Sequence, residues 1–186
     1  MATTQLPAGY RESGRIDLMK KIPAILLNFG GIVIAVAMIW FGTLIRPLYI
    51  GFDSIVLTWI VVGLMLAGIP LFFVTHELIH GVTMKYYGGK PKYGFTGLYA
   101  YCGCEIAYFD KREYAVINWA PVVLIGVILL VLNIALPNLF WVIYFFQVLN
   151  ISSAAGDYYM SYCMHKQPDD VLVIDTGLNM VCYSRG

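Results

Sequence analysis

The sequence predicts an all-α integral membrane bundle of four transmembrane helices, with a short cytoplasmic or interfacial β-strand element between the second and third spans. Hydrophobic residues make up 60% of the 186-residue chain and charged residues only 12%, about half of the roughly 25% typical of soluble domains. Four apolar segments each approach the ~20 residues that cross a bilayer. We therefore expect lipid to solvate most of the exterior of one membrane-embedded domain, residues 1–186.

The apolar segments give the predicted spans their approximate bounds, which are Pro23–Ile45, Ser54–Tyr87, Tyr114–Leu136 and Asn138–Met164. The first is longer than the apolar core of a signal peptide, so we interpret it as a retained span. The second is longer than a crossing requires and contains Pro70, which predicts a kink. The Gly88-Gly89 pair is expected to end that helix.

The segment between the second and third spans differs from them in pattern. Residues 92–109 are rich in aromatic residues and glycine and partly alternate, which predicts one or two short strands at the membrane surface. Residues 165–186 form a polar tail, in which residues 170–175 predict one more strand. Cys102 and Cys104 are interpreted as two inert thiols rather than a metal site.

Basic residues indicate how the chain is oriented. They gather in the N-terminal segment and again in the middle connection, whereas the two short connections hold one basic residue between them. The positive-inside rule therefore places both termini and the middle segment in the cytoplasm. The net charge of +1 gives no reason to expect a nucleic-acid partner.

The strongest chemical signal is the pentapeptide His76-Glu77-Leu78-Ile79-His80. Residues four apart share one face of a helix, so both imidazoles can reach a single Zn²⁺. Glu77 lies beside that pair, where its carboxylate can accept a proton from a zinc-activated water and later return it. Because ionisable groups in an apolar span are costly unless they are paired, we favour a metal site over two buried structural histidines.

A third ligand is needed to complete such a site, and Asp157 is the favoured candidate. At ~1.5 Å per residue, His76 lies roughly 33 Å and Asp157 roughly 29 Å from the outer ends of their spans. A helical stripe of Asn150, Ser153, Asp157 and Ser161 faces the bundle interior, and Asn150 and Ser153 are candidates for positioning a substrate. The alternatives for the third ligand are His165, Glu105 and Asp110, whereas Asp53 lies at the opposite end of the spans.

These features together resemble a known group of proteins. The motif on a kinked span, the surface strands, the Ala120-Pro121 pair and the Asn150-x-x-Ser-x-x-Gly-Asp157 pattern resemble site-2-protease-like membrane zincins. The Leu6-Pro-Ala-Gly-Tyr10 start and the chain length resemble small prokaryotic membrane proteins described as zincin peptidases. The resemblance implies one zinc ion held by His76, His80 and Asp157, Glu77 as the catalytic acid/base, substrate contact at Asn150, and a prokaryotic cytoplasmic membrane.

Three functions are compatible with these residues. The first is a zinc-dependent peptidase that hydrolyses peptide bonds of membrane proteins or peptides, within or next to the bilayer. The second is a non-catalytic metal-binding membrane protein that binds or regulates a partner. The third, a metal transporter or sensor, is least favoured, because the first and third spans supply few polar side chains for a transport path. The substrate and the oligomeric state are not predicted.

Overall fold

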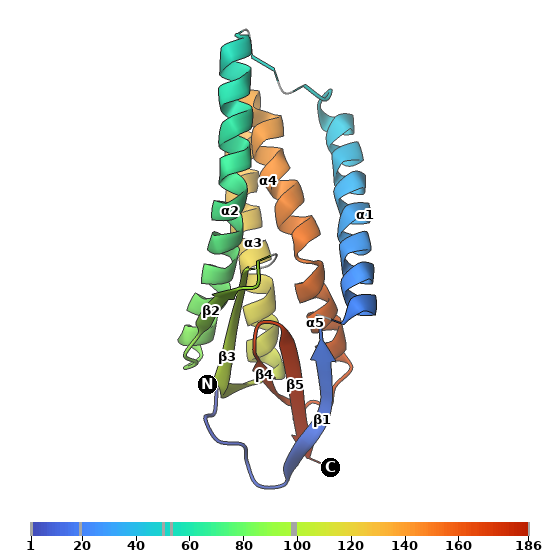
Figure 1. The fold of residues 1–186 in the computed structure, drawn as a ribbon, viewed down its shortest axis with the longest axis vertical. Coiled ribbons are helices and arrows are strands. Elements are labelled where there is room, and N and C mark those ends of the chain that lie inside the picture. Colours follow the sequence, from blue (N-terminus) through green and yellow to red (C-terminus); the bar gives the residue numbers. More distant parts are fainter. Residues whose placement is uncertain (1, 19, 50, 53, 98–99, 186) are drawn as a thin grey trace.

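The computed structural model describes residues 2–18, 20–49, 51–52, 54–97 and 100–185, so Asp53 lies outside the described residues. Four helical segments run side by side along the long axis of the molecule (Figure 1). They are α1 (Lys21–Ile45), α2 (Ile55–Tyr86), α3 (Lys111–Ala135), and a final segment composed of a 3₁₀ turn (Pro137–Leu139), α4 (Phe140–Ser153) and α5 (Ala155–His165).

All four helical segments are long and apolar enough to cross a bilayer. Their side chains also fit lipid as the solvent, since the most apolar stretch of α1 has no buried residue and that of α2 is only 11% buried. In water, such exposed apolar faces would be aggregation sites. The four helices are therefore candidate membrane spans, and the predicted spans agree with them to within about one turn.

The expectation of an all-α bundle is wrong, because the chain also forms a five-stranded antiparallel sheet. The strands are β1 (Tyr10–Asp17), β2 (Lys92–Phe95), β3 (Ala100–Asp110), β4 (Leu172–Asp175) and β5 (Asn179–Arg185). They lie in the order β1-β5-β4-β3-β2. The sheet thus joins the N-terminal segment, the middle connection and the tail at one end of the helices (Figure 1).

Sequence patterns found some of these strands and missed others. The middle segment forms β2 and β3, and the tail strand expected at residues 170–175 corresponds to β4. Neither β1 nor β5 was expected. β1 has the polar sequence Tyr-Arg-Glu-Ser-Gly-Arg-Ile-Asp, typical of an edge strand. Its partners in β5 lie 162 to 175 residues away along the chain.

Two helices depart from the predicted spans for local reasons. α3 begins three residues earlier than expected, because Asp110 caps it: its carboxylate accepts hydrogen bonds from the backbone amides of Arg112 and Glu113, both at 2.8 Å. The fourth span is interrupted at Ala154, where α4 ends and α5 begins. This break sets the direction in which α5 starts, three residues before Asp157.

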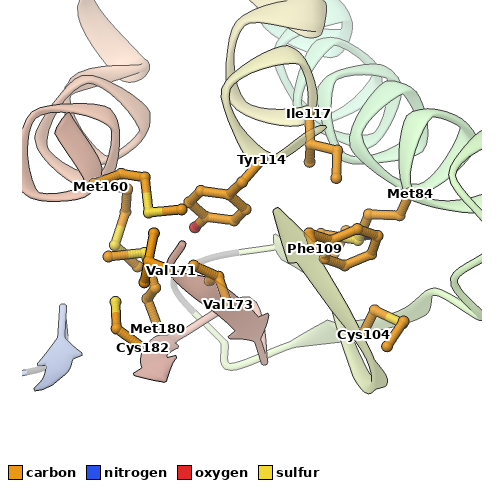
Figure 2. Close-up of a cluster of buried hydrophobic side chains, with 13 residues drawn as sticks. Met84, Cys104, Phe109, Tyr114, Ile117, Met160, Val171, Val173, Met180 and Cys182 are labelled. Atoms are coloured by element: carbon orange, nitrogen blue, oxygen red, sulfur yellow. Dashed lines mark hydrogen bonds between the residues drawn. The ribbon is translucent and has the colours of Figure 1, made fainter. Parts of the chain in front are cut away.

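The main core lies between the sheet and the adjacent ends of α2, α3 and α5. Figure 2 shows Met84 of α2 facing Phe109 of β3, with Tyr114 of α3 close to Met160 of α5. Phe109 and Tyr114 are completely buried. Because these contacts join the sheet to three helices, they fix the sheet directly beside the end of α2 that carries the His76–His80 motif.

Candidate metal centre

The two motif histidines lie on the buried face of α2, one turn apart. Their exposed fractions are 6% for His76 and 7% for His80, and their ring centroids are 4.9 Å apart. Glu77 follows His76 and lies beside this pair, where its carboxylate faces the backbone amide of Cys102 on β3. The i, i+4 spacing therefore places both imidazoles in one small volume.

Asp157, on the first turn of α5, completes the group. Its Oδ2 lies 3.2 Å from Nε2 of His76 and its Oδ1 lies 3.5 Å from Nε2 of His80. One ligand atom from each of the three residues lies within 4.8 Å of the others. The structure therefore brings together the three residues that the sequence suggested as ligands, although His76 and Asp157 are 81 residues apart in the chain.

The separations between these donor atoms suit zinc. With metal–ligand bonds of about 2.0–2.1 Å and tetrahedral angles, neighbouring ligand atoms lie about 3.3 Å apart, close to the 3.2 and 3.5 Å found here. Two imidazoles and one carboxylate form a donor set typical of catalytic zinc, which keeps one position open. Nδ1 of His76 is buried without a hydrogen-bond partner among the described residues, so this ring is held less firmly than that of His80.

A hydrogen bond that His80 donates to a backbone carbonyl of α3 determines the tautomer of its imidazole. Its Nδ1 lies 2.9 Å from the backbone oxygen of Ile117. Since a carbonyl oxygen only accepts, Nδ1 must carry the proton, and Nε2 is left with the lone pair that a metal requires. No residue type in the motif itself predicts this contact.

The alternative third ligands are occupied elsewhere. Glu105 is exposed and pairs with Lys92 at 3.1 Å, Asp110 caps α3, and His165 lies exposed in the last turn of α5. Within the described part of the chain, His76, His80 and Asp157 form the one cluster of side chains with metal-binding spacing.

Cys102 and Cys104 are both buried free thiols. Burial raises the pKa of the Cys102 thiol to about 12, so the thiol stays protonated at neutral pH. Because metals bind the thiolate, this agrees with the interpretation of Cys102 as an inert thiol.

The residues suggested for substrate positioning lie further from the centre. Asn150 is fully buried and its Nδ2 donates to the backbone oxygen of Val122 at 2.9 Å. The Ser153 hydroxyl donates to the Leu149 carbonyl of its own helix at 2.7 Å. Neither lines the cavity beside the histidines, and their role in substrate binding stays a prediction.

A cavity of about 70 Å³ adjoins His80 and is lined by polar side chains from five elements, which are α2, β3, α3, α5 and β4. Glu77, His80 and Asp157 form one wall. Asp175, which the sequence analysis missed, reaches the cavity from the C-terminal hairpin of β4 and β5. Its Oδ2 accepts from the Tyr114 hydroxyl at 2.8 Å and its Oδ1 from the Gly177 amide at 2.7 Å. The sequence predicted a strand at residues 170–175, but not that the strand would bring Asp175 to the candidate metal centre.

Comparison with known protein families identifies this arrangement. A family model described as "Putative zincin peptidase" matches residues 69–172, which include both histidines, Glu77 and Asp157. The chain belongs to this zincin family. The match begins just before Pro70 and ends at the first residue of β4, so Asp175 and the β1–β5 pair lie outside it. No curated protein and no solved structure matches the chain.

Membership in the zincin family implies zinc as the metal and a metallopeptidase as the type of enzyme. The zincin residues of this chain fit that metal by their donor set and spacing. The closer resemblance to site-2 proteases stays a prediction.

Proposed function

We propose that this zincin hydrolyses peptide bonds of membrane proteins or membrane-bound peptides, with His76, His80 and Asp157 as zinc ligands and Glu77 as the acid/base. The observation that carries the proposal is the convergence of the three donor side chains within 4.8 Å, with Glu77 directly beside them. Bound zinc supplies a Lewis acid that polarises the scissile carbonyl and acidifies a water molecule.

The protein residues then have separate tasks. His76, His80 and Asp157 would hold the metal, and the Ile117 carbonyl orients His80. The Glu77 carboxylate takes a proton from the attacking water and delivers it to the leaving amine.

The depth of the site favours cleavage next to the membrane surface on the side of the sheet. α2 has 32 residues, a length of about 48 Å, and His76 lies about 32 Å from its first residue. The hydrocarbon core is only about 30 Å thick. If α2 enters the core near its first residue, this length supports a centre at the far boundary of the core, close to the sheet.

An extended substrate could bind the edge of β3. Ala100–Gly103 pairs with β2 on one side, whereas β4 joins the other side only from Cys104 onward. Ala100, Tyr101 and Cys102 line the cavity. A peptide added there would form main-chain hydrogen bonds beside Glu77. A 70 Å³ cavity is far smaller than the roughly 300 Å³ of a small ligand pocket, so the β4–β5 turn, which abuts Cys102 and Gly103, would have to move.

The test is zinc content and cleavage measured on the full chain purified in detergent. The probes are single-span peptides in lipid vesicles and fluorogenic soluble peptides. Wild-type protein should hold one zinc ion and cleave a probe, His80→Ala should lose the metal, and Glu77→Gln should keep the metal without cleaving. Glu105→Gln, the same change at an exposed surface pair, should behave as wild type.

Three results would contradict the proposal in different ways. If purified wild-type protein held no zinc, the proposed metal site would be wrong. If Glu77→Gln cleaved the probes as fast as wild type, the proposed acid/base role of Glu77 would be wrong. Stoichiometric zinc without cleavage of any probe would favour the non-catalytic metal-binding protein instead.

A further inference from the structure

Helix α3 contains a proline in its interior, at position 121. Proline has no amide hydrogen, so the carbonyl four residues earlier loses its helical donor. In α3 that carbonyl belongs to Ile117. A buried carbonyl without a partner is destabilising, so another donor is expected to replace the missing amide.

The replacement donor is His80. Its Nδ1 lies 2.9 Å from the Ile117 oxygen in a buried contact between α2 and α3, and the Ile117 side chain is completely buried. The same imidazole directs Nε2 toward Asp157 at 3.5 Å. One hydrogen bond thus has two effects. It gives the Ile117 carbonyl a donor in place of the missing amide, and it orients the imidazole of a candidate zinc ligand.

The second proline inside a helix has no comparable partner. Pro70 in α2 leaves the Leu66 carbonyl without its helical donor. Among the described residues, no side chain hydrogen-bonds to that carbonyl. The connection between a missing amide and a zinc ligand is therefore particular to Pro121.

We propose that Pro121 is a positioning residue for the metal centre: by withholding an amide, it reserves the Ile117 carbonyl for His80 and so presents Nε2 of His80 to zinc. This inference rests on the proposed function, because it requires His80 to bind zinc. Groups that orient a metal-ligating histidine typically change metal affinity 10–100-fold when they are removed. The Ile117 carbonyl has a second lone pair, so it can accept from an added amide without losing His80 completely. The expected loss of zinc affinity is therefore near the lower end of that range, about 10-fold.

The experiment adds that amide and measures zinc affinity by chelator competition on the full chain in detergent. Pro121→Ala supplies an N–H to Ile117 and should raise the zinc dissociation constant about 10-fold. The same variant, stripped of metal, should unfold at the same temperature as wild type or a higher one, because α3 gains a hydrogen bond. A residue with a merely structural role would not weaken zinc binding while preserving stability.

Two further variants separate the amide from the ring. Lactic acid at position 121, introduced as an ester, removes the proline ring but supplies no N–H, and should retain wild-type affinity. Pro70→Ala adds an amide in α2 opposite a carbonyl that no zinc ligand contacts, and should also retain it.

Each contrary result has a definite meaning. Unchanged affinity in Pro121→Ala overturns the inference alone, provided that wild-type protein binds zinc. Equal weakening in the ester variant or in Pro70→Ala overturns it too, because helix straightening would then be the cause. Wild-type protein that binds no zinc overturns the proposed function, and the inference with it.

Discussion

The hydroxyl of Tyr114 on α3 donates a 2.8 Å hydrogen bond to Oδ2 of Asp175 on β4. Both side chains are buried and both line the cavity beside His80. This contact joins a membrane-spanning helix to the C-terminal hairpin, in a part of the chain that lies outside the matched zincin region. The hairpin is thereby part of the wall of the candidate site.

Removing that hydroxyl should loosen the hairpin. Tyr114→Phe leaves Asp175 with one partner, the Gly177 amide, and should lower the free energy of unfolding by about 1–3 kcal/mol. Limited proteolysis of residues 172–185 should become faster. Tyr144→Phe is the matched control, since it deletes a hydroxyl bonded to the Met38 carbonyl at 2.8 Å, between α4 and α1. If proteolysis of residues 172–185 were equally fast in Tyr114→Phe and Tyr144→Phe, this prediction would be contradicted.

Asp175 should also make stability depend on pH. Burial raises the pKa of its carboxyl above the ordinary value of about 3.9. A raised pKa in the folded state favours the protonated form, so this contribution is fully present below about pH 4 and is lost as the pH rises through the folded-state pKa. Relative to Asp175→Asn, wild-type protein should lose thermal stability as the pH increases above about 4.

The control for the pH series is Asp169→Asn, which changes an exposed carboxylate paired with Lys111 and should not reproduce the trend. A wild-type protein that gained stability over Asp175→Asn with rising pH would show that Asp175 is held as a stabilised carboxylate.

The close approach of the hairpin to β3 should require glycine at position 103. A Cβ atom there would collide with the backbone of Thr176, which cannot yield as a flexible side chain can. Gly103→Ala should destabilise the protein by about 2 kcal/mol or more, measured by thermal unfolding. Gly14→Ala on β1 meets nothing within 4 Å and should have little effect. Similar midpoints for the two variants would argue against tight packing at Gly103.

The three histidines of the chain should differ in how much their replacement weakens zinc binding. His76→Ala removes a ligand and should weaken zinc binding by more than the roughly 100-fold upper range for an outer partner. Asp157→Asn should also weaken it, since an amide is a poorer ligand than a carboxylate. His165→Ala removes the exposed histidine and should leave affinity unchanged. Loss of zinc in His165→Ala would point to a different coordination set.

Because β1 pairs with β5, we expect both strands to lie on the same side of the membrane. The positive-inside rule predicts that this side is the cytoplasm. Single cysteines at the exposed positions Lys166 and Leu48, in a background without native cysteines, should therefore react oppositely with an impermeant maleimide. In intact cells only Leu48→Cys should be labelled, and the reverse pattern would invert the topology.

The sequence by itself determined the features that depend on neighbouring residues. The spans follow from local apolar length, and the placement of His76 and His80 on one face follows from the period of a helix. The choice of Asp157 as a metal ligand needed one further argument, that a carboxylate in an apolar span requires a partner, and the structure places it 3.2 Å from His76.

Only the tertiary structure decided the features that depend on pairing between distant segments. The polar strand β1 becomes a strand through β5, and Asp175 reaches the cavity because β4 adds to β3. The Ile117 carbonyl orients His80 because α3 packs against α2. Hydrogen bonds of this kind use backbone groups, which nearly every residue carries, so the sequence alone does not name their partners. Pro121 leaves the Ile117 carbonyl without its helical donor, but only the packing of α2 against α3 brings His80 to it.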